Sequence, residues 1–198
     1  MLKKFLLSLG VVAAAEIPLK GAEPDFSHPR DVLGAAYATL AATEGDADAG
    51  PQRVRALLKI CVASESIDPD SIFHMIDVAS ELAAKEQCGS ARSLMQLVEA
   101  NLISDAYARR RWVYDRLETP AEPLPKSVAD WNGAQFRAQI KARALNALSV
   151  AAAHDAPLAD YADAVSADTR TLMYFPTVAD FVAQEVVGQL RRVGAGSD

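Results

Sequence analysis

The chain has few of the residues that metal and redox sites require. Its 198 residues include two cysteines and three histidines. The histidines (His28, His74 and His154) are scattered, and no His/Cys pair has the spacing of metal ligands, so we expect no metal. Cys61 lies in the apolar stretch ALLKICVA, and Cys88 lies in KEQCGSA at a predicted helix boundary. Either the two cysteines form a disulfide, as an oxidising compartment would allow, or Cys61 is a small buried apolar residue and Cys88 is a free thiol.

The motifs of common catalytic sites are also missing. There is no G-x-S-x-G nucleophile elbow. Three serines lie near an acid and a histidine, but all are on or between predicted helices: Ser64, Ser66, Ser71, Asp68 and His74. Asp160 and Asp163 are three residues apart on a predicted helix, which is typical of a solvated face. Nothing indicates a pocket that shifts pKa values, so we expect no catalytic residue, no cofactor and no enzymatic activity.

Positive charge is in short supply. The chain has 20 Lys and Arg against 26 Asp and Glu, a net charge of −6, which becomes −8 when Lys3 and Lys4 are removed. Nucleic-acid binding rests on phosphate neutralisation by a basic face, so we expect no nucleic-acid partner. The segment RRRWVYDR, residues 109–116, is a local exception.

No apolar run reaches the roughly 20 residues that a membrane-spanning helix needs. The N-terminus, MLKKFLLSLGVVAAAE, instead has the pattern of a secretory signal: two lysines, a short apolar block and Ala13-Ala14-Ala15. We predict a signal peptide over residues 1–15, with a second possible cut after Ala22 and a buried N-terminal helix as the alternative. The mature chain is then exported, periplasmic or associated with the cell envelope, without a transmembrane span.

What the sequence has in abundance is helix signals. Alanine is frequent, strict alternation is almost absent, and apolar residues recur at helical spacing. Prolines or cap residues open segments at Pro29, Pro51, Asp68-Pro69, Gly89-Ser90 and Asp130-Trp131-Asn132. We predict an all-α fold of five to seven helices, built as stacked antiparallel hairpins in an irregular bundle or solenoid. The helical domain covers 29–192, after an extended segment at 16–28 and before a disordered tail at 193–198.

A proline-rich strap interrupts the helices at 117–130, where Pro120, Pro123 and Pro125 disfavour helix. Trp131 follows it, at the start of the next helix. A large ring beside an irregular segment is well placed to close the edge of a core. We therefore predict that Trp131 is buried and locks the strap onto that helix.

Two segments are candidate interaction surfaces. Arg109, Arg110 and Arg111 fall near the end of a long predicted helix, where cations complement the helix dipole and where Trp112 and Tyr114 can pin the strap to the core. The alternative is that they bind a partner. The second segment is the closing helix, which Thr177 and Asp180 cap. Its apolar residues either remain uncovered for a partner or complete the core of the domain: Phe181, Val182, Val186, Val187 and Leu190.

The order of landmarks resembles the N-terminal helical region of alpha-2-macroglobulin-like proteins of Bacteroidetes-type bacteria. The landmarks are the signal peptide, DFSHPRDVL, IDPDS, RWVYDR, the strap to ADWNGAQFR, and YFPTVADFVAQE, from about Asp25 to Gln189. The most distinctive pair is Trp131 with Phe136 and F-P-T-x-x-D-F at 175–181.

The resemblance implies a non-catalytic scaffold that serves protease trapping by docking on downstream macroglobulin-like β-sandwich domains. Some members of that family carry a Cys-Gly-Glu-Gln thioester. The nearest string here, residues 86–89, has those residue types in another order, so no thioester residue is carried over. The alternative is an independent helical module that binds an envelope protein or peptide in a groove between hairpins.

Overall fold

A computed structural model describes residues 28–118 and 123–194, and within them the regular structure is helical. The all-α prediction is confirmed. The predicted signal peptide, all of the extended segment except His28, and the last four residues lie outside the described part of the chain.

The first hairpin joins α2 (Pro29–Ala42) to α3 (Gly50–Ile67). Both helices have proline in their first turn, where the missing N–H costs no hydrogen bond. The connection contains the short 3-10 helix η1 (Ala47–Ala49), which Asp46 caps by accepting a hydrogen bond from the N–H of Asp48. Gly45 takes a positive φ of 78°, which favours glycine.

The second hairpin joins α4 (Ile72–Lys85) to α5 (Gly89–Arg109). The prediction that α4 begins with Asp68-Pro69 was wrong by one turn. Asp68 instead ends α3, and its carboxylate accepts a hydrogen bond from the N–H of Asp70. This local turn competes with helix, as aspartate side chains commonly do.

The third pair is α7 (Gly133–Ala153) and α10 (Val178–Gly194). Asn132 and Gln135 form a full capping box at the start of α7. The predicted cap of α10 is confirmed, since the N–H of Asp180 donates to Thr177 Oγ1 at 3.2 Å. α10 continues to Gly194, so the predicted tail boundary at residue 193 was two residues too early.

Short elements fill the connections. They are α6 (Arg111–Tyr114), η2 (Val128–Asp130), η3 (Leu158–Tyr161), α8 (Ala162–Val165) and α9 (Thr169–Tyr174). The described residues form nine α-helices, more than the predicted five to seven. The difference comes from three short helices of four to six residues, α6, α8 and α9. The six long helices are those that the sequence signals predict.

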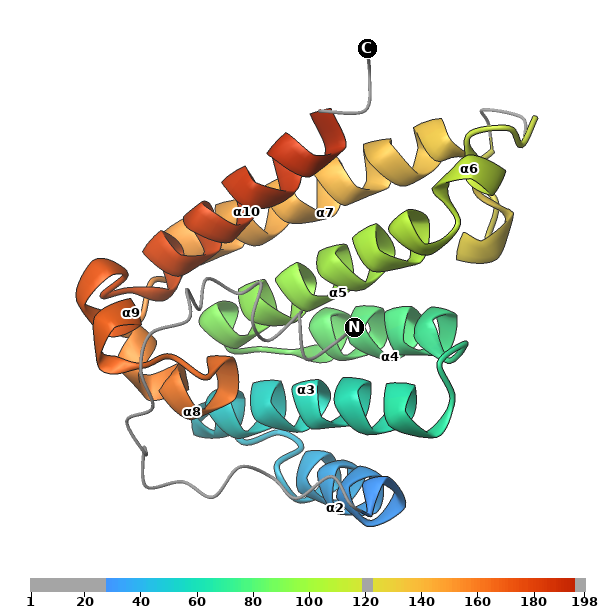
Figure 1. Cartoon of the computed structure of the whole chain (residues 1–198). Helices are drawn as coiled ribbons and strands as arrows, with labels where there is room; N and C mark the ends of the chain where they lie inside the picture. Colours follow the sequence, from blue (N-terminus) through green and yellow to red (C-terminus); the bar gives the residue numbers. More distant parts are fainter. Residues whose placement is uncertain (1–27, 119–122, 195–198) are drawn as a thin grey trace.

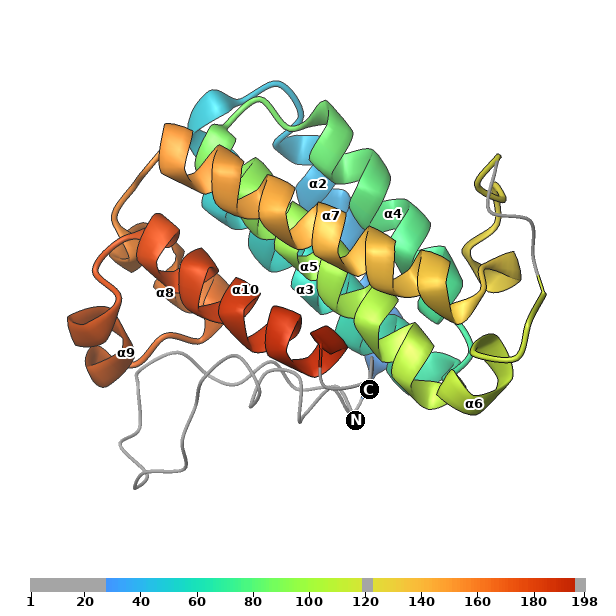
Figure 2. The same cartoon turned by 90° about the horizontal axis from the view of Figure 1, so that it is seen from above.

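The hairpins stack in the predicted way. Figure 1 shows α2 and α3 at one edge of the molecule, α4 and α5 in the middle, and α7 and α10 at the other edge, with successive long helices antiparallel. α5 is the central helix, which packs against α3, α4, α7 and α10. Figure 2 shows α7 crossing over α5 with α10 beside it. Most residues of α5 itself are buried, and most of these are small or apolar, as expected of a helix that is packed on all sides.

Candidate interaction sites

Arg109, the first arginine of RRRWVYDR, is a structural anchor. Its guanidinium donates to Glu65 Oε1 and to the carbonyl of Pro69, both at 2.6 Å. These contacts tie the end of α5 to the end of α3 and to the turn that follows it. Arg110 is different, because its nearest acid is Asp70 at 3.9 Å and both side chains are largely exposed. An exposed pair of this kind contributes little to stability.

A cluster of four aromatic rings lies beneath this segment, with Phe136 at its centre. The ring centroids of Tyr107, Tyr114 and Trp131 are 5.4, 4.6 and 5.5 Å from that of Phe136. The indole N–H of Trp131 donates to the carbonyl of Pro125 at 2.9 Å. Trp131 is only 4% exposed, so the prediction that it is buried and locks the strap is confirmed.

Asp115 closes the edge of that cluster. It accepts hydrogen bonds from Tyr107 at 2.7 Å, from Arg137 at 2.9 Å and from Arg111 at 3.2 Å. Desolvation favours the protonated acid, but these hydrogen bonds outweigh it and hold the pKa of Asp115 below its usual value. Gly133 leaves room for this carboxylate, because a Cβ there would collide with it.

Trp112 does not pin the strap, and that prediction was wrong. Its side chain is 69% exposed, whereas Tyr114, two residues later, is buried. Residues two apart on a helix point in nearly opposite directions, so one of the two rings had to face solvent.

Arg111 and Arg116 are exposed beside Trp112, and Leu117 is 39% exposed. Exposed side chains of three arginines, an indole and a leucine therefore lie in and around α6, beyond the C-terminal end of α5. We call this surface the arginine–tryptophan tip: Arg110, Arg111, Trp112, Arg116 and Leu117.

The closing helix mostly completes the core. Phe181 is 2% exposed, and Val182 and Val186 are buried with it. Leu190 is half-buried and packs on the same cluster. Val187 alone of this set is exposed, at 42%. Of the two alternatives for this face, the structure therefore supports an internal role, and Phe181 is not available to a partner.

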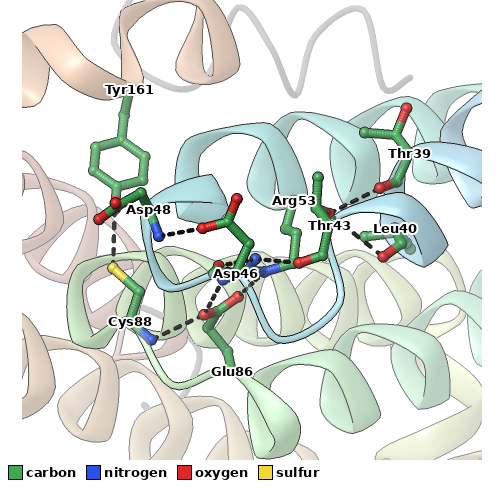
Figure 3. A network of polar contacts seen from close by, with 9 residues as sticks. All are labelled: Thr39, Leu40, Thr43, Asp46, Asp48, Arg53, Glu86, Cys88 and Tyr161. Atoms are coloured by element: carbon green, nitrogen blue, oxygen red, sulfur yellow. Dashed lines mark hydrogen bonds and ion pairs between the residues drawn. The ribbon is translucent and has the colours of Figure 1, made fainter.

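A polar network that the sequence reasoning missed joins the two hairpins (Figure 3). Arg53 of α3 makes a bidentate ion pair with Glu86, the residue after α4, with both N–O distances 2.6 Å. The same guanidinium donates to the carbonyls of Thr43 and Asp46. Glu86 in turn accepts from the N–H of Cys88 at 2.9 Å. One arginine thus fixes the α2–α3 connection against the α4–α5 connection.

The network is largely shielded from water. The side chains of Arg53 and Glu86 are 11% and 2% exposed. Burial alone would raise the pKa of Glu86, but the hydrogen bonds from Arg53 and from the backbone of Cys88 outweigh burial and lower it. Losing one partner of such a pair leaves a buried charge uncompensated, which typically costs about 3–5 kcal/mol.

Next to this network lies a pocket of about 240 Å³. Leu40, Ala41, Leu82 and Met95 form its apolar part. Polar residues line the remainder: Glu44, Asp46, Arg53, Lys85, Glu86 and Gln87. The sequence signal that could have indicated this pocket is the acid-rich loop EGDAD, residues 44–48.

The two cysteines are free and occupy different environments. Cys61 is fully buried, and desolvation raises the pKa of its thiol to about 12. Cys88 is half-buried, and its sulfur lies 3.5 Å from the hydroxyl of Tyr161. Of the two alternatives for the cysteines, the structure has the unpaired one.

The serines and acids singled out in the sequence do not converge. Ser66 donates to the carbonyl of Val62 within α3, Ser71 donates to the carbonyl of Asp68 in the turn between α3 and α4, and His74 is exposed. Asp163 faces Arg55 at 3.5 Å on the surface. Within residues 28–118 and 123–194, no group of three or more His, Cys, Asp or Glu side chains could hold a metal ion. In the same residues, no helix combines the length and the apolar character needed to cross a membrane.

No family model matches the chain, and no curated protein or solved structure is significantly similar to it. The resemblance to the macroglobulin-like region, and the export and protease trapping that it implies, therefore stay predictions.

Proposed function

We propose that the chain is a non-catalytic helical scaffold of the cell envelope that binds a protein partner. In its first form the scaffold is the N-terminal part of an alpha-2-macroglobulin-like protease-trapping protein, and the partner is the set of downstream macroglobulin-like domains. In its second form it is an independent helical module that binds an envelope protein or peptide. Both forms need a surface suited to another protein.

The exposure of Trp112 supports this proposal. The four rings of the aromatic cluster are buried, whereas Trp112, outside that cluster, places an indole in solvent at 69% exposure. Tryptophan and arginine are the residues most enriched among those that dominate binding energy at protein interfaces. The arginine–tryptophan tip combines both, and the positive charge of Arg110, Arg111 and Arg116 favours an acidic partner.

Site-specific photo-cross-linking in cells that naturally make the protein tests the proposal. A benzophenone amino acid replaces Trp112 in one variant and Leu145 in a control variant, since Leu145 is also exposed, at 42%. We expect a discrete protein adduct from position 112 in the exported fraction. Changing Arg110 and Arg116 to Glu should reduce that adduct.

Adduct yield at position 112 no higher than at position 145 would contradict the proposal. The mass and sequence of the adduct separate its two forms. A cross-link to β-rich macroglobulin-like domains supports the first form, and a cross-link to an unrelated envelope protein supports the second.

A further inference from the structure

The arginine–tryptophan tip and the pocket beside Arg53 lie at opposite ends of one helix. Glu86 and Gln87, which line the pocket, immediately precede α5, and Arg110 immediately follows it. A helix of 21 residues is about 31 Å long. In Figure 1, α5 runs from the α4–α5 connection at one end of the molecule to α6 at the other. The two sites therefore cannot contact each other within one chain.

The pocket suits a single large side chain. Its volume of about 240 Å³ is below the roughly 300–1,000 Å³ of pockets that hold drug-sized ligands. Met95 is fully buried at the pocket wall, and Leu40 and Leu82 are half-buried beside it. An aromatic ring that enters would exchange water for these apolar contacts.

The mouth of the pocket favours positive charge. Glu44 and Asp46 are exposed at the mouth, and Asp48 follows on the same loop. Arg53 does not offset them, because its guanidinium is already committed to Glu86 and to two carbonyls. Among the described residues that line the pocket, Lys85 is the remaining cation, and it lies 4.0 Å from Glu81.

The opposite end of the chain presents the complementary chemistry. Trp112 is an exposed aromatic ring, and Arg110 and Arg116 are exposed close to it in the chain, while Asp115 partly offsets the charge of Arg111. Arg110 is 65% exposed along its side chain, and within the described residues its ion-pair partner is Asp70, at 3.9 Å. An acidic mouth with an apolar wall and a basic tip with an aromatic ring match in both charge and polarity.

We propose that Trp112 of one copy inserts into the Leu40–Met95 pocket of a second copy, with Arg110 and Arg116 facing Glu44 and Asp46. This inference goes beyond the proposed function, because the occupant of the tip is here a second copy of the chain and not a macroglobulin-like domain or an envelope protein. The contact uses different surfaces on the two copies, so the pair keeps one free pocket on the first copy and one free tip on the second. Association is then head to tail and open-ended, and its mean size grows with concentration.

Sedimentation equilibrium of the full chain with two complementary variants tests this arrangement. Trp112→Ala removes the tip and keeps the pocket, whereas Ala41→Trp fills the pocket and keeps the tip. Each variant alone should stay monomeric, with self-association at least about tenfold weaker than in the wild type. An equimolar mixture should form 1:1 dimers that do not grow further, because only one productive pair of surfaces remains.

The wild-type chain should show a weight-average mass that rises with concentration and falls with added salt, since exposed ion pairs are screened. Leu145→Ala serves as a control that should associate like the wild type, and an unchanged melting temperature shows that each variant folds. A wild type that stays monomeric up to millimolar concentration would overturn the proposal, and so would a mixture of the two variants that stays monomeric. A monomeric wild type that still gives a foreign protein adduct at position 112 would overturn only self-association and leave the proposed function standing.

Discussion

Glu185 is a carboxyl group buried on the core face of α10, with only 6% of its surface exposed. Its neighbours on that face are Phe181, Val182 and Gln189, and Gln189 donates a hydrogen bond to Asn101 of α5. Desolvation raises the pKa of Glu185 from 4.5 to about 7, and Arg192 opposes the rise only in part. A core that contains such a group is expected to respond to pH near neutrality.

The direction of that response follows from proton linkage. Because the pKa of Glu185 is higher in the folded chain, the folded chain retains the proton between pH 4.5 and 7 while the unfolded chain releases it. The stabilising effect of the proton is complete below pH 4.5 and is lost as the pH rises through 7.

Glu185→Gln should raise the free energy of unfolding at about pH 8 by up to about 3 kcal/mol and change it little near pH 4. Urea unfolding at both pH values measures this difference, and the exposed Glu44→Gln is the control. Equal pH dependence in the two variants would show that Glu185 is not desolvated.

Trp131 and Trp112 offer a matched pair of single-residue tests. Trp131→Ala removes a buried ring and its hydrogen bond to Pro125, and should lower the free energy of unfolding by roughly 3–5 kcal/mol. Trp112→Ala removes a ring that is mostly in solvent, and should change that free energy in the dilute monomer by no more than about 0.5 kcal/mol. Thermal and urea unfolding of both variants give the comparison. A Trp131→Ala chain as stable as the Trp112→Ala chain would mean that the strap is not held by Trp131.

At the scale of the element, close packing at the first residue of α5 fixes how α5 meets the end of α7. Ser90 donates to the carbonyl of His154, which directly follows α7. A Cβ at Gly89 would collide with the Cβ and ring of His154, and the near part of that side chain cannot swing away. This helix start therefore depends on glycine for space.

Replacing that glycine should separate the two helices. Gly89→Ala is expected to lower the free energy of unfolding by about 1–3 kcal/mol, as overpacking does. Gly34→Ala is the contrasting variant, because Gly34 lies in α2 with no atom within 4 Å of the added Cβ. Alanine there should stabilise the chain by about 0.5–1 kcal/mol through its better helix propensity. If the two substitutions change the melting temperature in the same direction, the close contact at His154 is not formed.

The long helices could be predicted from the sequence because their ends carry local signals. Prolines open α2 and α3, and Thr177 with Asp180 opens α10. The segment between α7 and α10 could not be predicted in the same way, because distant backbone contacts hold it. Leu158 N–H donates to the carbonyl of Pro176, and Val178 N–H donates to that of Ala156. Such pairings leave no periodic trace in the sequence.

The candidate sites were predictable only in part. The burial of Trp131 was predicted correctly from its position beside the strap. The exposure of Trp112 depends on which side chains of α6, a helix of only four residues, face the core. The ion pair of Arg53 with Glu86 joins residues 33 positions apart, and no local motif marks it. The pocket beside it arises from the stacking of the two hairpins, so it appears only once the tertiary fold is known.

At the scale of the whole molecule, charge is distributed unevenly over the stack. The chain carries a net charge of −6, and acids line the mouth of the pocket at one end of α5. Three exposed arginines lie within four residues of the exposed Trp112 at the other end. An acidic protein can therefore present a locally basic surface, and this is the surface that the proposed function assigns to a partner.

Hydroxyl-radical footprinting of Trp112 tests the binding role of that surface most directly. Oxidation of each residue is compared between intact cells and the purified chain at high dilution, and Met173, which is 70% exposed on α9, is the internal control. If a protein partner covers the arginine–tryptophan tip, Trp112 should be oxidised several-fold less in cells than in the dilute chain, while Met173 should be oxidised equally in both. Equal oxidation of Trp112 in the two samples would mean that nothing covers the tip, and would contradict the binding role proposed for it.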